Sequence, residues 1–460
     1  MALWFLIAIS CIGNASAQDG NEDRLARAAA TFNDAQDLHE KGLISEAIAL
    51  YRKALSISEE FPEAQFQLGI ALLQVGDSKE AESYLRRALE LRPDWTLPIL
   101  PLTRILMLDG RESEAVSLLD SGIEREPSNP ALLAERAFIA LDSSADATNL
   151  GRLLEKITDV TRGANSAGPA ILARASLELR LGRMSEALVS VNRAVKDEPG
   201  NVNAIRLRGE IELAKEDFSS ALSTADFLLS LPGSRDDAII IKAQALIGIG
   251  RTGEGVELLN SFESLKPGLK RKASRLLARH TEDAATISRL LSIFPDDEEI
   301  LFIICTSRAN RSAEIVISAC SRLLSLKPDR NSDALGSRAA AFLKSRRFQE
   351  ALLDYESIIA VEPGNANATA GRSLALFNLG QWEAAGLSFE RLIASSSEFP
   401  VAFYYLGIIY DRLSRPLDAM KSYERFLAVA DRSKMSDEIE RTELRLSVLR
   451  KQSKTRKNQR

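Results

Sequence analysis

Small apolar residues recur along this chain at a fixed spacing of 34 residues. Alanine takes the repeated position three times in succession, each time with a glycine five residues before it, at Ala47, Ala81 and Ala115. The spacing returns at Ala187, Ala221 and Gly255, and again at Ala351, Ala385 and Ala419. Bulky residues follow four positions later at Tyr51, Tyr355, Phe389 and Tyr423. A fixed period of this length predicts a solenoid of repeated helical units.

Each repeated unit predicts a helix, a turn and a second helix. A further small residue comes seven positions after the repeated alanine, as at Ala54, Ala88 and Ala194, so both lie on one helix face that can approach a neighbour closely. Proline follows five residues later, where it ends one helix and opens the next, at Pro93, Pro127, Pro199, Pro267 and Pro363.

These residues resemble the tetratricopeptide repeat pattern, W-x2-L-G-x2-Y, then A-x3-F, then P. The clearest matches are Leu68-Gly69 with Ala81, Ala88 and Pro93, and Leu406-Gly407-x2-Tyr410 with Ala419 and Tyr423. The resemblance implies an all-α fold, a right-handed superhelical α-solenoid of antiparallel helix pairs. It gives nine regular units, which begin near Ala28, Pro62, Thr96, Gly168, Val202, Asp236, Ser332, Ala366 and Pro400. The tryptophan position departs from the pattern, since it holds Gln65, Ile99, Ile205 or Thr369.

Two stretches, 130–167 and 270–331, keep helical apolar spacing but lose the small residues. We interpret them as degenerate helical repeats, with a joint at Gly163–Pro169 in the first, which is rich in turn residues. They divide the regular units into three blocks, 28–129, 168–269 and 332–433. A capping helix over 434–450 and a basic disordered tail over 451–460 complete the predicted organisation.

Composition agrees with helix pairs built from alanine and leucine. The chain has 460 residues, of which 45% are apolar, 6% aromatic and 27% charged. Its net charge is −5, and without the six basic residues from Arg450 to Arg460 the remainder carries about −11. An acidic body argues against a nucleic-acid partner. The basic tail is either a solvated end or a weak peripheral contact with anionic lipid, cell wall or an acidic partner.

The N-terminal segment predicts export. Residues 2–13 are uncharged and mainly apolar, and Asn14-Ala15-Ser16-Ala17 precedes a polar run. This pattern is typical of a signal peptide over residues 1–17, cleaved near Ala17, and places the mature chain in an extracytoplasmic space, periplasmic or secreted. The alternative is an N-terminal membrane anchor, although about 20 apolar residues are needed to span a bilayer. Lipidation at Cys11 is a weaker alternative.

Two cysteines would remain after cleavage, Cys305 and Cys320. They fall on the two expected helices of one irregular unit, where antiparallel packing brings such positions face to face. In an oxidising compartment they are either a disulfide or two buried free thiols.

Enzyme chemistry finds no support in the sequence. The only two histidines, His39 and His280, lie far apart, and neither has metal-ligand spacing to acidic or sulfur side chains. Phosphate loops, nucleophile elbows and zinc-protease motifs do not occur. The series Gly248-x-Gly250-x-x-Gly253 lies at an expected inter-helix turn. We therefore expect no catalysis, no metal and no cofactor.

The resemblance places partner-binding positions on the first helices, at the second, fifth, ninth, twelfth and thirteenth residues of each unit. In units beginning at Pro62, Thr96 and Pro400, the groove candidates are Phe66, Ile70, Leu100, Arg104, Met107, Tyr404, Ile408 and Arg412. Apolar and aromatic side chains beside arginine are typical of recognition hot spots. For Phe66 and Ile70 the alternative is a place in the core between repeats. Pro98 and Pro101 should also delay or bend the first helix of their unit.

The carboxylate clamp of co-chaperone members of this family is missing, since its positions hold Phe32, Gln36, Gln67, Leu97 and Pro101. The sequence thus predicts a non-catalytic interaction scaffold that binds a protein or peptide segment. Envelope assembly or secretion is the setting that the resemblance suggests for an exported member. The alternatives are a self-associating structural module and a regulatory part of an enzyme system; the oligomeric state stays open.

Overall fold

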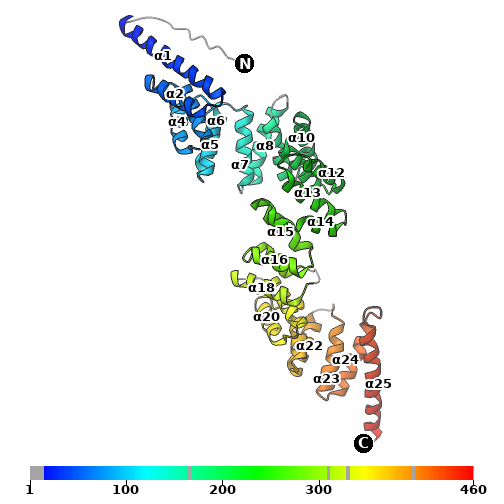
Figure 1. The fold of residues 1–460 in the computed structure, drawn as a ribbon. Helices are drawn as coiled ribbons and strands as arrows, with labels where there is room; N and C mark the ends of the chain where they lie inside the picture. Colours follow the sequence, from blue (N-terminus) through cyan, green and yellow to red (C-terminus); the bar gives the residue numbers. More distant parts are fainter. Residues whose placement is uncertain are drawn as a thin grey trace. The chain divides into compact units, whose positions relative to one another are not determined.

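The computed structural model describes residues 15–458, except residue 144 and residues 163–167, 308–310, 328–331 and 396–398. For residues 15–21, 395 and 454–458 it describes the backbone alone. The described residues form 25 α-helices, one short 3-10 helix and no strand, which confirms the predicted all-α fold (Figure 1). Residues 1–14 of the predicted signal peptide, including Cys11, and residues 163–167 of the predicted joint lie outside the described residues.

The chain divides into two compact units, with the boundary between Pro232 and Gly233. This boundary falls inside the predicted regular block 168–269, and the division of the repeats into three regular blocks stays a prediction. The helix just before the boundary, Phe218–Leu229, is the second helix of its pair and has 12 residues, whereas the second helix Ser78–Leu91 has 14. Pro232 and Gly233, the latter with a φ of 76°, then form the turn. The Pro-Gly turn therefore marks the boundary between the two units.

The N-terminal unit contains six helix pairs. Its helices are α1 (Ala15–Glu40), α2 (Ile44–Ile57), α3 (Pro62–Gln74), α4 (Ser78–Leu91), α5 (Ile99–Leu108), α6 (Glu112–Arg125), α7 (Pro130–Asp142), α8 (Ala147–Thr161), α9 (Gly168–Arg180), α10 (Met184–Asp197), α11 (Val202–Ala214) and α12 (Phe218–Leu229).

The C-terminal unit contains six pairs and one further helix. Its helices are α13 (Arg235–Gly248), α14 (Thr252–Leu259), η1 (Phe262–Ser264), α15 (Pro267–His280), α16 (Ala284–Ile293), α17 (Glu298–Thr306), α18 (Ala313–Leu326), α19 (Ser332–Lys344), α20 (Phe348–Val361), α21 (Ala366–Asn378), α22 (Trp382–Ser395), α23 (Val401–Arg412), α24 (Pro416–Val429) and α25 (Ser436–Asn458).

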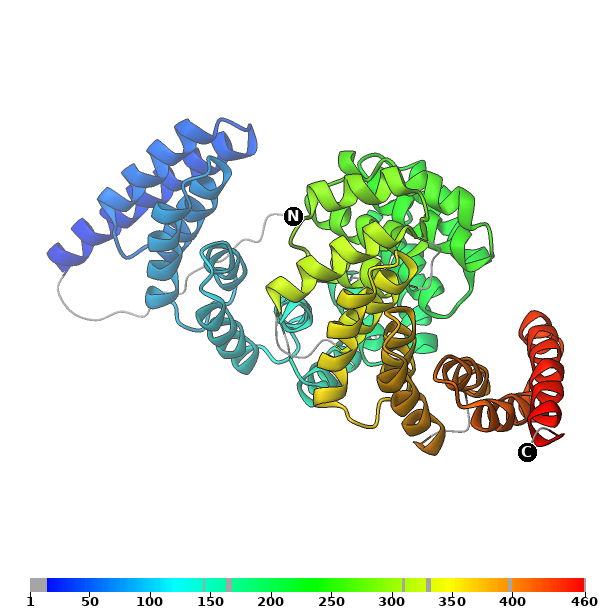
Figure 2. The ribbon, with the colours of Figure 1, turned by 90° about the horizontal axis from the view of Figure 1, so that it is seen from below.

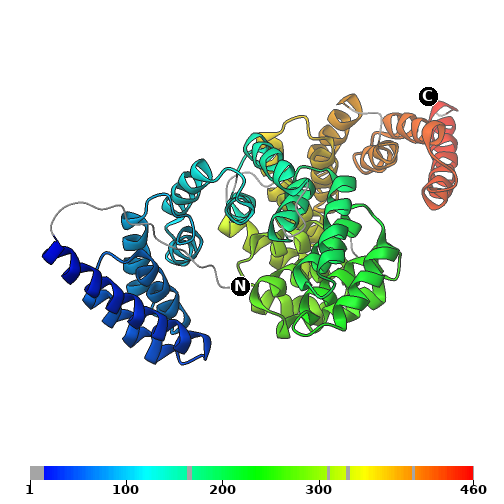
Figure 3. The same ribbon diagram turned by 90° about the horizontal axis from the view of Figure 1, so that it is seen from above.

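Each first helix packs on the second helix of its pair, and the repeated alanines lie at this contact. Ala47, Ala81 and Ala115 are fully buried, as are the equivalent alanines of later units. The long α1 lies alongside α2, and α25 lies beside α24, as Figures 2 and 3 show. Small side chains at these positions let the helix axes approach closely, which explains why the sequence repeats them.

The residue five positions before the repeated alanine adopts a left-handed backbone whether or not it is glycine. Gly42, Gly76 and Gly110 have φ values of 77°, 84° and 73°. In three other units the position holds Glu216, Arg346 and Ser414, with φ values of 60°, 58° and 57°. A residue with a Cβ atom is strained there by roughly 1–2 kcal/mol.

Replacing Glu216, Arg346 and Ser414 by glycine should therefore stabilise the protein. Relief of the strain exceeds the entropy that glycine loses on folding, so we expect a gain of about 0.5–1 kcal/mol at each site. Urea unfolding of each single variant measures the change. The reverse substitution, Gly76→Ala, should destabilise by a similar amount, because only the backbone opposes it: no atom lies within 4 Å of the added Cβ. Equal stability of all four variants with the parent would contradict this account.

The two degenerate stretches form packed helix pairs. In the first, α8 replaces the small residues with larger apolar ones and buries Leu150, Leu153, Leu154 and Ile157. Gly168 and Pro169, interpreted as turn residues, instead form the first turn of α9, where proline is tolerated. In the second stretch, α15–α18 share a core with α13 and α19.

A disulfide joins Cys305 on α17 to Cys320 on α18, with the two Cα atoms 4.9 Å apart. Both cysteines are buried. The bond therefore links the two helices of one irregular pair across its interior.

The ends of α1 and α25 differ from the expected ones, while the start of α5 agrees with the sequence. α1 is described from Ala15, which is 13 residues before the predicted unit start at Ala28. α25 continues to Asn458, so the predicted disordered tail over 451–460 is wrong as far as that residue. Lysine, arginine and glutamine are good helix formers, and cations are favoured near a helix C-terminus. α5 begins only at Ile99, as the two prolines predicted.

Candidate functional site

The predicted groove residues belong to both units, and each group forms its own surface. In the N-terminal unit they lie on α3 and α5. In the C-terminal unit they lie on α23. All three are first helices of their pairs.

Phe66 on α3 belongs to a small aromatic cluster. Its ring meets that of Trp95 edge-on, with centroids 5.1 Å apart, and the Arg92 guanidinium lies 5.0 Å from the Trp95 ring centroid. Arg92 also forms an ion pair with Glu63. Phe66 and Ile70 are both half-buried, which places them between the two alternatives of groove and core.

The outer surface of α5 is mostly apolar and accessible. Leu97 is 58% exposed and Leu108 is 83% exposed. Leu100 and Met107 are half-buried, while Arg104 is exposed and makes no hydrogen bond or ion pair with any residue that the structure describes. Accessible aliphatic side chains in such number are typical of a protein-interaction surface.

The residues of α23 are held by their own neighbours. The Tyr404 ring lies 5.6 Å from that of Tyr405 and 5.5 Å from that of Phe426. The Arg412 guanidinium lies 5.8 Å from the Trp382 ring centroid. Tyr404 therefore contributes to packing as well as to the surface.

α25 takes up part of this same surface. Arg445 of α25 donates from Nη2 to Oδ1 of Asp411 at 2.8 Å, and Ile408 is half-buried against the core of the unit. Leu446 and Leu449 of α25 are buried in the core that also contains residues of α23 and α24. The α23 surface is accordingly less available to a partner than that of α5.

A groove that the sequence analysis did not name crosses α7, α9 and α11. Two cavities of about 420 and 690 Å3 share Phe138, Ser176, Arg206 and Leu207 in their walls. They adjoin through these four residues and form one depression, which we call the α7–α11 groove.

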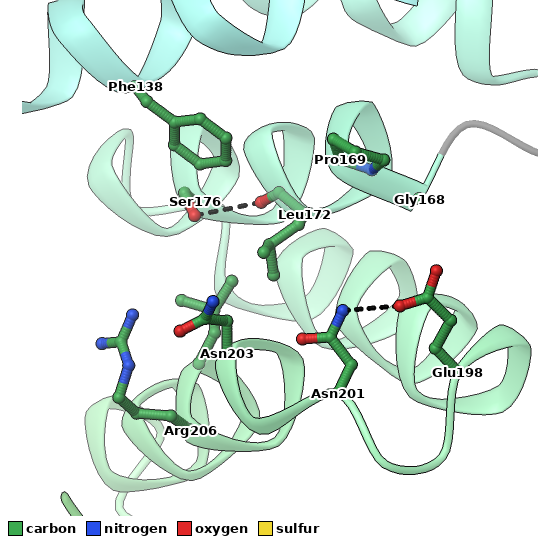
Figure 4. A pocket seen from close by; sticks show the side chains of 10 residues that line it. Phe138, Gly168, Pro169, Leu172, Ser176, Glu198, Asn201, Asn203 and Arg206 are labelled. Carbon is green, nitrogen blue, oxygen red and sulfur yellow. Dashed lines mark hydrogen bonds between the residues drawn. The ribbon is translucent and has the colours of Figure 1, made fainter. Parts of the chain in front are cut away.

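The floor of the α7–α11 groove is apolar and its rim is polar. The apolar side chains come from all three helices and are Phe138, Leu141, Leu172, Leu179 and Leu207. The polar side chains around them are Asp142, Ser176, Arg180, Glu198, Asn201, Asn203, Arg206 and Glu210. In Figure 4, Phe138 points from α7 toward Ser176 and Leu172, while Asn203 and Arg206 point from α11 into the same space.

Several rim groups are fixed by internal hydrogen bonds. Ser176 Oγ donates to the Leu172 carbonyl at 3.0 Å, and Asn201 Nδ2 donates to Glu198 Oε2 at 2.8 Å (Figure 4). Asn203 is exposed and makes no hydrogen bond with any other described residue. Fixed walls around an open amide give a largely pre-formed site.

The rule that partner-facing residues are the second, fifth, ninth, twelfth and thirteenth of each unit, which we call the position rule, would have found this groove. Counted from Pro130, Phe138, Leu141 and Asp142 are the ninth, twelfth and thirteenth residues. Counted from Gly168, the second, fifth, ninth, twelfth and thirteenth residues are Pro169, Leu172, Ser176, Leu179 and Arg180. The 34-residue count therefore continues into the stretch that looked degenerate.

The tyrosine and histidine side chains between neighbouring helices are buried or hydrogen-bonded within the fold. Burial raises the pKa of Tyr51 to about 12, and burial does the same for Tyr355. His39 lies between two polar neighbours, with Nδ1 3.2 Å from Tyr51 Oη and Nε2 3.1 Å from Gln74 Oε1. Among the described residues no group of three or more His, Cys, Asp and Glu side chains could hold a metal ion.

None of the described helices is both long and apolar enough to cross a bilayer.

Comparison with protein families identifies the repeat. A TPR repeat model matches residues 35–76, and a tetratricopeptide repeat model matches residues 62–95. A further tetratricopeptide repeat model matches residues 172–230 and 337–400. The matched segments lie in both units.

Among curated proteins, the chain is similar to DnaJ homolog subfamily C member 3 of Rattus norvegicus, with 25% identity over 341 residues. The alignment covers 69% of this chain and 62% of the relative. The same protein of Bos taurus is 23% identical over 344 residues with the same coverage. The chain thus spans less than two thirds of the length of these relatives.

Three solved structures are similar to this chain at low sequence identity. The TPR domain of P58(IPK) is 18% identical and aligns with 77% of this chain and 99% of its own, with a TM-score of 0.24. The type IV pilus biogenesis factor PilW is 11% identical, over 53% of this chain and 98% of its own, with a TM-score of 0.38. Yeast Tom70 is 13% identical, over 93% and 96%, with a TM-score of 0.30.

Proposed function

Because the chain belongs to the tetratricopeptide repeat family, whose members are scaffolds for protein interaction, we propose that it is a non-catalytic adaptor. Its α7–α11 groove binds an apolar segment of a partner protein. The observation that carries this proposal is the groove itself, which has an apolar floor from three successive first helices and a fixed polar rim.

The groove favours a segment with large apolar side chains. Phe138 and Leu172 offer a floor that gains free energy when it is covered, at about 25 cal/mol per Å2 of apolar surface. The exposed Asn203 amide has donors and an acceptor for the backbone of the bound segment. Leu97, which precedes α5, and Leu108, the last residue of α5, are further exposed apolar side chains of the same unit.

The proposed setting is extracytoplasmic, in envelope assembly or secretion. The uncharged N-terminal stretch followed by Asn14-Ala15-Ser16-Ala17 supports export. A disulfide between Cys305 and Cys320 would be stable in an oxidising compartment. The basic residues from Arg450 to Arg460 would add a weak contact with an anionic surface or an acidic partner.

A photoreactive amino acid at Asn203 should capture the partner in the cells that produce the protein. The same residue at Val189, which is 72% exposed on the second helix α10, serves as the control position. The captured segment is then synthesised and its affinity measured. Phe138→Ala should weaken binding tenfold or more, the size of loss expected for a buried aromatic anchor.

A thermal melt of Phe138→Ala separates loss of affinity from loss of structure. Val189→Ala should leave the affinity unchanged. Equal capture from both positions, or equal affinity of both variants, would remove the groove from the mechanism. Capture of copies of this chain alone would favour the self-associating module instead.

The intact mass of the protein isolated from producing cells tests the setting. After alkylation without reductant, we expect a chain that begins after Ala17 and carries no alkyl group, since Cys305 and Cys320 are paired. A mass that includes residues 1–17 would support the anchored alternative. Two alkyl groups on the shortened chain would show free thiols and argue against an oxidising compartment.

A further inference from the structure

We propose that α15 and the hollow beside it form a second binding site, one that takes an acidic segment of a partner protein. The site lies in the C-terminal unit. Its chemistry is the opposite of the apolar α7–α11 groove, so it goes beyond the proposed function and does not depend on it.

α15 presents a row of cations on one face. Arg271, Lys272, Arg275 and Arg279 fall within an arc of about 100°, at 100° of rotation per residue. The other side of the helix is buried, at Ala273, Ser274, Leu277 and Ala278. Counted from Pro267, the three arginines are the fifth, ninth and thirteenth residues, which are partner-facing positions in the other units.

Part of this basic face already holds carboxylates. Arg271 Nε lies 3.2 Å from Oδ2 of Asp297, and Arg275 Nη1 lies 2.7 Å from Oε2 of Glu299. These acids come from the loop before α17 and from α17 itself. The fold therefore shows that arginines of α15 form ion pairs with carboxylates of an adjacent chain segment.

The rest of the basic face is unoccupied by acids. Lys272 and Arg279 are both exposed, and neither forms an ion pair with any residue in the described part of the chain. The chain as a whole carries −5, so a cluster of this kind is not an average property of its surface. Exposed arginines in a planar, bidentate geometry favour carboxylates.

A hollow of about 840 Å3 opens beside the cations. Its walls include Arg271 and Arg275, together with Phe294, Phe302 and Leu323. They also include four acids, each of which is paired with a cation: Asp296, Asp297, Glu298 and Glu299. Phe302 is 41% exposed. An acidic segment that carries one aromatic or aliphatic residue could place its carboxylates on the cations and that apolar side chain against Phe302.

The same features disfavour a membrane surface or a nucleic acid. A flat bilayer cannot fill a hollow, and among the described residues the basic face offers a nucleic acid only two unpaired cations, Lys272 and Arg279. A peptide segment can alternate acidic and apolar residues to match both the cations and Phe302. An acidic protein segment is thus the partner that the site fits.

Two fluorescent synthetic peptides test the proposal on the full-length chain. One carries six glutamates around a central phenylalanine, and the other has glutamine in place of each glutamate. We expect the acidic peptide to bind at least tenfold more tightly, with affinity that falls as salt is raised. The Lys272→Glu/Arg279→Glu variant should lose that advantage.

The control variant is Arg391→Glu/Lys421→Glu, which makes the same change of charge at two exposed positions on α22 and α24. It should bind the acidic peptide as the parent does, and so should Phe138→Ala, because that residue belongs to the other site. Equal loss in both charge variants, or equal binding of the two peptides, would overturn the proposal. Preference for anionic vesicles or RNA over the acidic peptide, measured in the same assay, would overturn it as well.

Discussion

Arg311→Met is expected to lower the free energy of unfolding by about 2–5 kcal/mol, which would make it one of the most damaging single substitutions in the chain. Arg311 is only 4% exposed. Methionine is of similar length and apolar, so the variant removes the charge and the hydrogen bonds while it leaves little empty space.

The reason is the set of carbonyls that this side chain satisfies. Nη1 of Arg311 donates to the carbonyls of Ile303 and Ile304 at 3.1 and 2.9 Å. Nη2 donates to the carbonyls of Ala278 and Thr281. The acceptors lie at the C-terminal ends of α15 and α17, where backbone carbonyls have no partner within the helix and the helix dipole favours a cation. One guanidinium therefore caps two helices and ties them together.

Urea unfolding of Arg311→Met beside Arg322→Met distinguishes this role from a general loss of charge. Arg322 lies on α18, is 50% exposed and pairs with Asp296, so its replacement should change stability by less than about 1 kcal/mol. Arg311→Lys should fall between the two variants, because an ammonium cannot reach both helix ends with the same geometry. Equal stability of Arg311→Met and Arg322→Met would show that the cap contributes nothing.

Arg311 also shows what sequence periodicity cannot reveal. The repeated alanines predicted the helix pairs because each unit repeats the same local contact. Arg311 stands outside the repeat. Its role depends on two helix ends, one of which, at Ala278, lies 33 residues before it in the chain. A single arginine in a loop gives no signal of such a contact.

The candidate sites divide in a similar way. The position rule selected Leu100, Arg104 and Met107, which the structure places on α5 with Arg104 exposed and the other two half-buried; their role in binding stays a prediction. It also holds for Phe138 on α7, but the missing alanines hid the unit to which that residue belongs. For Tyr404 the rule could not anticipate the ring contacts with Tyr405 and Phe426, which also give this residue a role in packing.

Gly371→Ala is expected to destabilise the C-terminal unit by about 1–3 kcal/mol, although alanine is the better helix former. A Cβ atom at this position would lie 2.2 Å from Cζ of Tyr355 and 2.5 Å from both Cε atoms of that ring. Tyr355 is 7% exposed and cannot move without disturbing the core. The gain in helix propensity is about 1 kcal/mol, so the steric clash outweighs it.

Gly364→Ala is the matched control, since no atom lies within 4 Å of its added Cβ, and it should change stability by less than about 1 kcal/mol. A double-mutant cycle identifies the ring as the cause. In a Tyr355→Ala background the clash is gone, so Gly371→Ala should become neutral or stabilising, which gives a coupling energy of at least 1 kcal/mol between the two sites. Additive effects in urea unfolding would mean that the cost arises elsewhere on α21. Gly407 stands in the same relation to Tyr423, because its added Cβ would lie 2.3 Å from the ring. The coupling energy should therefore have the same sign for this second glycine–tyrosine pair.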